Sequence, residues 1–194
     1  MRLFFHKAVP GAPTLPVLHS ETLVLRCFDL NDAVDVYNAA KNETAALLEG
    51  WTPHQSLEES RAWIETIQAE GCTWAIVEKK TGRLTGAISL SADAMRKVEK
   101  AKTMRITLGE ENWGRGIALE ACRVVMRYAF AELDCPVLSM THLTQNSNSR
   151  RVAKKLGFVY EGTLRLAQPL GENGWGDWML YSMTQQEFLA LEAK

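Results

Sequence analysis

The sequence predicts a mixed α/β domain built on one central β-sheet. Segments with the composition of β-strands alternate with helical patterns along the 194 residues. Two strand segments, 73–78 and 84–90, flank the polar turn 79–83 and predict a β-hairpin. The longest helical pattern, 114–133, follows a further strand segment. This order of elements is typical of one sheet with helices packed on its faces.

The N-terminal part begins with a proline-rich segment. Residues 1–20 contain three of the six prolines, so we expect an extended lead-in to a single domain over 21–194. Leu23–Arg26 has the pattern of a strand. Asp29 then precedes the apolar repeat of Ala33–Ala40, and an aspartate in this place is a helix start signal.

A second helix is expected to start after Ser56, because Ser56 and Glu59 have the spacing of a capping box. Its apolar face would hold three side chains: Trp63, Ile64 and Ile67. After the hairpin, a polar stretch over 91–100 leads into a further strand over 103–108. The first half of the chain is therefore expected to supply a strand, two helices and three antiparallel strands.

The second half continues the alternation. After the helix 114–133, the sequence predicts a strand over 137–142 and a short helix marked by Ser149, Val152, Ala153 and Leu156. Gly157 would end that helix. Two more strands are expected, one beginning at 158–160 and one over 178–183. Thr184 and Glu187 have capping-box spacing and predict a terminal helix.

Charge and composition argue against several functions. The formal net charge is −1, whereas a general nucleic-acid-binding domain is usually basic. No apolar run approaches the about 20 residues of a membrane span, and the start of the chain is too short an apolar stretch for a secretory signal. The four cysteines are scattered without metal-ligand spacing. We therefore expect a cytoplasmic protein with no metal and no nucleic-acid or membrane partner.

A glycine-rich loop joins the strand 103–108 to the longest helix. Gly114 and Gly116 would let the backbone approach a ligand, and a helix start presents unpaired N–H groups and partial positive charge. These features favour a phosphate site, although the glycines alone also fit a tight strand-to-helix turn. A nucleotide P-loop is disfavoured because Ile117 follows Gly116, and a Rossmann loop because Leu119 replaces the third glycine.

Three separated motifs occur in order: Trp113-Gly114-Arg115-Gly116-Ile117-Ala118, then Asn146-x-x-Ser149, then Leu156-Gly157-Phe158. In this combination the chain resembles the GNAT superfamily of acetyltransferases, and more narrowly its Rim-type branch, which acetylates the N-termini of ribosomal proteins. The resemblance covers residues 22–183. It implies a mixed, mostly antiparallel sheet flanked by helices and splayed between its fourth and fifth strands, with acetyl-CoA bound in the splay.

The resemblance also assigns residues to acetyl-CoA. The pyrophosphate would lie on the loop formed by Trp113, Gly114, Arg115, Gly116, Ile117 and Ala118. The pantetheine arm would pair with the end of the fourth strand, at Ile106, Thr107 and Leu108, where a backbone N–H would polarise the acetyl carbonyl. Asn146 would reach the pantetheine arm, and Ser149 would lie near the thiol.

Catalytic residues follow less directly from the resemblance. Ser149 is the expected proton donor to the thiolate, because Ala153 stands where many relatives have a tyrosine; a serine here also fits a helix cap or first turn. Thr103 and Gln168 occupy positions where relatives carry a carboxylate base. His142 is the first candidate base, since histidine transfers protons near neutral pH, but it also suits a packed strand. The remaining candidates are Glu161, Glu172 and Asp177.

The resemblance implies transfer of an acetyl group from acetyl-CoA to a primary amine by direct attack in a ternary complex. A protein N-terminal α-amine is the expected acceptor, because its pKa of about 7.7–8.0 lies far below the about 10.4 of lysine. A small amine (an antibiotic, a polyamine or an amino acid) and a non-catalytic acyl-CoA sensor are alternatives. Trp51 and the loop 171–176 would line the acceptor entrance. A monomer or homodimer is expected.

Overall fold

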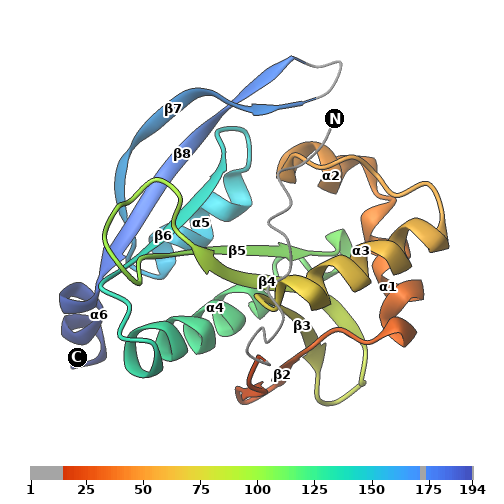
Figure 1. Cartoon of the computed structure of the whole chain (residues 1–194), viewed down its shortest axis with the longest axis horizontal. Helices are drawn as coiled ribbons and strands as arrows, with labels where there is room; N and C mark the ends of the chain where they lie inside the picture. Colours follow the sequence, from red (N-terminus) through yellow and green to blue (C-terminus); the bar gives the residue numbers. More distant parts are fainter. Residues whose placement is uncertain (1–14, 171–173, 194) are drawn as a thin grey trace.

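One sheet of eight strands runs through the molecule (Figure 1). The computed structural model describes residues 15–170 and 174–193. The strand order is β1-β2-β3-β4-β5-β6-β8-β7. Neighbouring strands are antiparallel except β5 and β6, which are parallel. The predicted mixed, mostly antiparallel sheet flanked by helices is therefore confirmed.

The strands are Leu18–His19 (β1), Leu23–Arg26 (β2), Thr73–Glu78 (β3), Leu84–Ala92 (β4), Lys102–Leu108 (β5), Val137–Leu143 (β6), Val159–Pro169 (β7) and Trp175–Thr184 (β8). The α-helices are Ala33–Ala40 (α1), Glu43–Glu49 (α2), Leu57–Glu70 (α3), Ile117–Arg127 (α4), Ser147–Lys155 (α5) and Gln185–Glu192 (α6). Three short helical segments complete the described chain: Leu30–Asp32 (η1), Glu110–Asn112 (η2) and Tyr128–Glu132 (η3).

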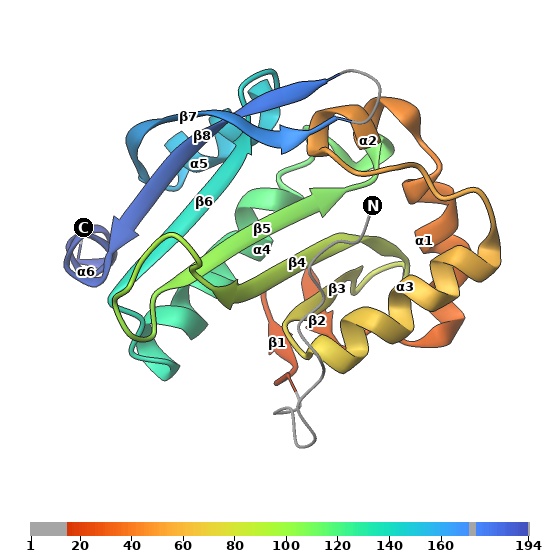
Figure 2. The same cartoon turned by 45° about the horizontal axis from the view of Figure 1, so that its top comes forward.

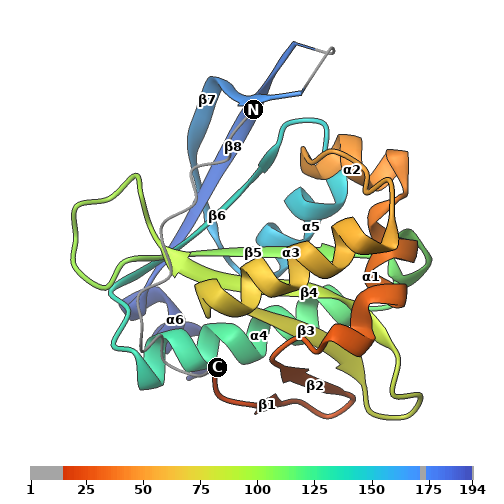
Figure 3. The same ribbon diagram turned by 45° about the vertical axis from the view of Figure 1, so that its right-hand side comes forward.

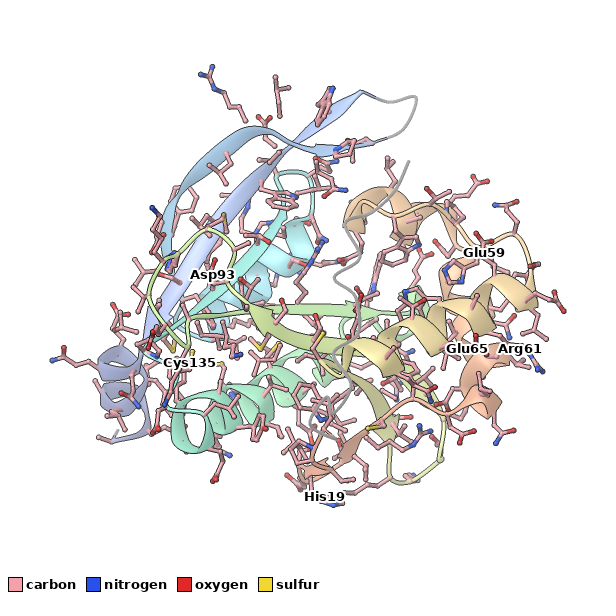
Figure 4. All side chains as sticks on the ribbon, in the orientation of Figure 1. His19, Glu59, Arg61, Glu65, Asp93 and Cys135 are labelled. Carbon is pink, nitrogen blue, oxygen red and sulfur yellow. The ribbon has the colours of Figure 1, made fainter. Side chains whose placement is uncertain are left out.

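Strand β3 shows why both faces of the sheet are buried. Trp74 and Ile76 belong to the larger core cluster, which includes α4, α5 and α6, whereas Ala75 and Val77 pack with α1 and α3. Successive side chains of a strand point to opposite faces, so the sheet lies between two helical layers (Figure 3). The outer side of α3 is charged and exposed, as Figure 4 shows for Glu59, Arg61 and Glu65.

The end of the lead-in lies at one edge of the sheet, and the last two strands lie at the other edge. Within the lead-in 1–20, Leu18–His19 already pairs with β2, and the indole N–H of Trp74 donates to the carbonyl of Pro16 at 2.8 Å. At the other edge, β7 and β8 form a hairpin longer than the predicted segments, and it extends beyond the rest of the sheet (Figure 1).

The helix after β5 differs from the prediction at both ends. Gly114 and Gly116 have φ angles of 74° and 85°, which an α-helix does not contain. The first residue of α4 is therefore Ile117, and the predicted start at Gly114 is wrong. The α-helix ends at Arg127 and continues as the π-helical segment η3. Apolar spacing could not reveal either change, because it does not report backbone angles.

Helix α2 is a helix that apolar periodicity does not predict, since it contains only seven residues. Asn42 caps its start by accepting the N–H of Ala45 on Oδ1 at 2.9 Å. Gly50 ends it in the left-handed conformation, with φ 79°. An asparagine before and a glycine after a short segment are the two signals that could have identified it.

The two predicted capping boxes have different outcomes. At α6, Thr184 and Glu187 each accept the other's backbone N–H, so this box is confirmed. At α3, the hydroxyl of Ser56 accepts the N–H of Glu59 at 3.1 Å, but the Glu59 carboxylate accepts the N–H of Gln55 instead of that of Ser56. The helix start is as predicted, and the reciprocal half of the box is wrong.

Candidate active site

The parallel strands β5 and β6 separate after a short paired segment. Their ladder contains only the pairs of Lys102, Thr103 and Met104 with Leu138, Ser139 and Met140. Beyond it the two strands diverge (Figure 2). We call residues 105–108 of β5 and 141–143 of β6 the open end of the sheet. Backbone groups of β5 that point toward β6 there have no strand partner, and the predicted splay between these strands is confirmed.

The loop after β5 adopts a conformation that needs glycine. Positive φ at Gly114 and Gly116 is unfavourable for other residues. Among the described residues, no heavy atom lies within 4 Å of a Cβ built at either position. The glycines are thus required by the backbone and leave open space beside it. This geometry fits a loop whose backbone approaches a phosphate group.

Trp113 and Arg115 hold the loop against the sheet. The indole N–H of Trp113 donates to the carbonyl of Leu108 at 3.0 Å. Arg115 forms an ion pair with Glu78 on β3 and donates to Oδ1 of Asn112 at 2.7 Å. The predicted loop residue Arg115 therefore has its charge paired with a carboxylate, and its side chain secures the loop to β3 and η2.

The start of α4 presents backbone N–H groups beside this loop. Gly116 is the N-cap and provides no side-chain acceptor, so the N–H groups of Ile117 and Ala118 lack a side-chain cap. Unpaired N–H groups and the helix dipole together favour an anion. In the first turn, Glu120 instead accepts the N–H and hydroxyl of Thr22, each at 2.8 Å, which ties α4 to the start of β2.

Several of the residues on β5 and α4 predicted to contact acetyl-CoA have side chains packed in the core. Leu108 and Ile117 are buried, and Ile106 packs against the same cluster. Thr107 faces the opposite side of β5, as strand alternation requires. Any contact of Ile106, Leu108 or Ile117 with the pantetheine arm or pyrophosphate must therefore come from their backbone groups.

Asn146 joins the start of α5 to the end of α2. Its Oδ1 accepts the N–H of Ser149 at 2.9 Å and caps α5. Its Nδ2 donates to the carbonyl of Leu48 at 3.2 Å and to Oε1 of Glu49 at 3.1 Å. The residue is 3% exposed. Contact of its amide with a pantetheine group would require one of these hydrogen bonds to be exchanged.

Ser149 lies in the first turn of α5. The cap of this helix is Asn146, so the hydroxyl of Ser149 has no capping role. Within residues 15–170 and 174–193, the structure gives this partly exposed hydroxyl no hydrogen bond. Its position beside the turn that follows β6 leaves the hydroxyl available as a proton donor.

His142 lies on β6 and is buried against aromatic side chains. Its ring stacks on Tyr181 with centroids 5.5 Å apart, and Nδ1 is 2.8 Å from the carbonyl oxygen of Leu143. A proton on Nδ1 satisfies that carbonyl and leaves Nε2 with a lone pair and no partner among the described residues. Burial lowers the pKa of His142, so the ring is neutral at pH 7.

The other predicted candidates for a base have structural partners or lie elsewhere. Glu161 accepts hydrogen bonds from Ser182 at 2.5 Å and Arg96 at 2.6 Å, which lower its pKa. Arg96 also contacts Asp93, labelled in Figure 4, in the loop after β4. Asp177 accepts a backbone N–H from the opposite strand. Glu172 and the rest of residues 171–173, half of the loop 171–176, fall outside the described residues.

Glu49, at the end of α2, is a candidate that the sequence patterns did not indicate. It is partly buried, and Oε1 accepts the hydrogen bond from Asn146. Burial raises the pKa of its carboxyl to about 7, although the Asn146 hydrogen bond and the charge of Arg105 oppose that rise. No short sequence signal could show this, because Glu49 and Asn146 are separated by 97 positions.

The rest of the described chain limits the chemistry. No group of three metal-ligating side chains occurs in the part of the chain that the structure describes. All four cysteines are free thiols, and burial raises the pKa of Cys122 to about 12. No helix in residues 15–170 or 174–193 is long and apolar enough to cross a membrane. Trp51 is half-buried, and its indole N–H donates to the carbonyl of Ala40.

Comparisons with known proteins agree with this geometry. Residues 22–159 match the family model described as an acetyltransferase (GNAT) domain. YoaA of Bacillus subtilis (strain 168), an uncharacterized N-acetyltransferase, is 28% identical over 164 residues, covering 82% of this chain and 90% of YoaA. A GCN5-related N-acetyltransferase from Brucella melitensis has a TM-score of 0.81 at 20% identity, covering 94% of this chain and 84% of that one. RimL, a ribosomal L7/L12 α-N-protein acetyltransferase solved with coenzyme A, has a TM-score of 0.74 at 20% identity, covering 89% and 99%.

Proposed function

The chain belongs to the GNAT family of acetyltransferases and is an acetyl-CoA-dependent N-acetyltransferase, and we propose that its acceptor is a protein N-terminal α-amine. The observation that carries the placement of acetyl-CoA is the open end of the sheet next to the glycine loop. The unpartnered edge of β5 suits the amides of the pantetheine arm, and the start of α4 suits the pyrophosphate.

The acceptor class is supported by two arguments. An α-amine, with a pKa of about 7.7–8.0, is substantially neutral near pH 8, so it needs less help from a base than a lysine amine. RimL, whose fold this chain shares, is described as an α-N-protein acetyltransferase. An α-amine on an extended N-terminus is therefore the acceptor we propose over a small free amine.

In the proposed reaction, one group of the protein polarises the thioester carbonyl and another protonates the sulfur that leaves. A backbone N–H near Thr107 or Leu108 would polarise the thioester carbonyl, as preorganised donors do in acyl transfer. The amine nitrogen attacks that carbon, and the C–S bond breaks. Ser149 would then donate its hydroxyl proton to the leaving thiolate. His142, with a free Nε2 lone pair, is one group that could accept a proton.

A panel of acceptors tests the proposed function. Peptides with a free N-terminus and no lysine are expected to give a kcat/KM at least about 10-fold above those of spermidine, free amino acids and an aminoglycoside. Release of the CoA thiol measures the rate, and the same peptides with a blocked N-terminus are the control. A strong preference for one small amine would contradict the α-amine. Binding of CoA without turnover on any acceptor would instead indicate a sensor.

Replacing Ser149 by alanine tests the proton donor. Loss of general acid catalysis typically lowers a rate by a factor of 10² or more, so S149A is expected to lower kcat about 10²-fold. The KM for acetyl-CoA should change less than about twofold, because the backbone N–H of Ser149, which bonds to Asn146, is retained. Ser147, exposed on the same helix, supplies the control S147A. A kcat for S149A within about threefold of the wild-type value would exclude the acid role.

A further inference from the structure

Helix α2 connects the two strands that separate at the open end of the sheet. At its start, Nδ2 of Asn42 donates to Oε2 of Glu110 at 2.7 Å, in the η2 segment that follows β5. At its end, Leu48 and Glu49 accept hydrogen bonds from Asn146, in the turn that follows β6. A single short helix is therefore tied to the ends of both diverging strands, and its last residue lies beside the open end.

The hairpin of β7 and β8 contacts the same end of α2. Nε2 of Gln168, on β7, donates to the carbonyl of Gly50 at 3.1 Å. The side chain of Gln168 packs so closely that a Cβ on Gly50 would lie 3.1 Å from its Cγ. Gly50 also has positive φ. The residue before it, Glu49, is thus held between α5 and the hairpin by contacts on both sides.

The surroundings of Glu49 leave one carboxylate oxygen available. Among the described residues, Oε1 accepts from Asn146 and no hydrogen bond reaches Oε2. Arg105 of β5 is the charged group whose field reaches the carboxyl. The guanidinium of Arg105 lies over the ring of Trp178, 5.9 Å from its centroid. The neutral amides of Asn146 and Gln168 face this end of α2 from α5 and β7.

We propose that Glu49 accepts the proton that the acceptor amine must lose before it attacks the thioester. This inference rests on the proposed acetyl transfer but not on a particular acceptor. Asn146 links Glu49 to Ser149: one amide side chain bonds to the carboxylate through Nδ2 and to the N–H of Ser149 through Oδ1. The side chain of Asn146 therefore fixes the position of the proton acceptor relative to the proton donor at the open end of the sheet.

The amine nitrogen loses two protons during the transfer. Glu49 takes one proton from the ammonium form of the amine and later releases it to solvent. The nitrogen lone pair forms the new C–N bond, the C–S bond breaks, and sulfur leaves with the electron pair. The nitrogen loses a second proton as the amide forms, and that proton replaces, through solvent, the one that Ser149 gives to the thiolate. The products are the amide, the CoA thiol and one proton in solution.

The acidity of Glu49 suits this role. Its pKa of about 7 makes the carboxylate a stronger base than an ordinary glutamate and still leaves about half of it ionised at pH 7. The rate should therefore rise with pH through about 7, because only the ionised carboxylate can take a proton. His142 on β6 is the other candidate base at the open end, but Nδ1 is hydrogen-bonded to the carbonyl of Leu143 and the ring is stacked on Tyr181.

Glu49→Gln removes the proton acceptor while retaining an oxygen that can accept the Asn146 hydrogen bond. We expect kcat at pH 7 to fall about 10²-fold, with the Kd for CoA, measured by calorimetry, unchanged within about twofold. Glu43→Gln, an exposed position on the same helix, is the matched control and should leave both values unchanged. A kcat for E49Q equal to that of the wild type overturns the proposal.

The pH profile separates Glu49 from the acceptor amine. If Glu49 is the base, the rise of the rate with pH has its midpoint near pH 7 for every amine, and E49Q loses this rise. If the rise instead reports deprotonation of the amine, its midpoint moves from about pH 8 with an α-amine to about pH 10 with a lysine-like amine. If His142→Gln loses the rise near pH 7 and E49Q retains it, His142 is the proton acceptor and the proposal is overturned.

Direct titration gives a readout that does not depend on turnover. In protein labelled with ¹³C at the glutamate carboxyls, the resonance missing from E49Q is expected to titrate near pH 7 in the wild type. Titration near the ordinary value of about 4.3 overturns the proposal. Acetylation of small amines but not of peptides refutes the α-amine acceptor and leaves the Glu49 test measurable. No turnover with any amine refutes both.

Discussion

Gly116→Ala is expected to weaken the binding of CoA by about 100-fold. Gly116 is the N-cap of α4 with φ 85°, and an L-residue in the left-handed region costs about 1–2 kcal/mol. Relief of this strain would rotate the N–H groups that start α4 away from the pyrophosphate. A hydrogen bond to a charged group contributes about 1.5–3 kcal/mol, so loss of one or two such bonds corresponds to about 100-fold in Kd. Calorimetry with CoA measures the change.

The matched control for this substitution is Gly82→Ala. Gly82 lies in the turn between β3 and β4 with φ 68°, and no described heavy atom lies within 4 Å of an added Cβ. Both variants should therefore lose a similar amount of stability, about 1 kcal/mol. Only G116A should lose affinity for CoA. Equal affinities in the two variants would show that the loop does not hold the pyrophosphate.

Trp74→Ala is expected to lower the free energy of unfolding by about 4 kcal/mol. Trp74 is 1% exposed and packs edge-on against Tyr128 with ring centroids 5.8 Å apart. Removing a buried tryptophan costs about 3–5 kcal/mol through lost burial and the cavity left behind. The variant also loses the hydrogen bond from the indole to Pro16. Urea denaturation followed by circular dichroism gives the free energy.

Trp175→Ala provides the comparison of the same residue type at the surface. Trp175 is 60% exposed at the start of β8. Its removal should change stability by about 0.5 kcal/mol or less, as is usual for surface positions. Because Trp74 packs in the cluster that also contains α4, W74A should in addition weaken CoA binding at temperatures where it is partly unfolded. Similar losses in the two variants would mean that Trp74 is not central to the core.

The central strands β2 to β6 were predictable because their determinants are local. Thr73–Glu78 has the bounds that its composition and the following turn predict. The cap of α6 is likewise contained in Thr184 and Glu187. The start of α4 was not predictable from apolar spacing, since two glycines in the left-handed conformation displace it to Ile117. Helix α2 was missed because seven residues carry too short an apolar pattern for a periodicity to register.

The residues of the site were likewise predictable only where a local motif identifies them. The glycine loop and the motif Asn146-x-x-Ser149 could be located in the sequence, because each is a run of neighbours whose spacing carries its own meaning. Their joint position at the end of β5 and β6 required the sheet, in which two strands pair over three residues and then separate. The contact of Glu49 with Asn146 spans 97 positions. Such a contact has no local determinant: it exists because α2, α5 and the β7–β8 hairpin pack together, and burial there gives an otherwise ordinary glutamate its altered acidity.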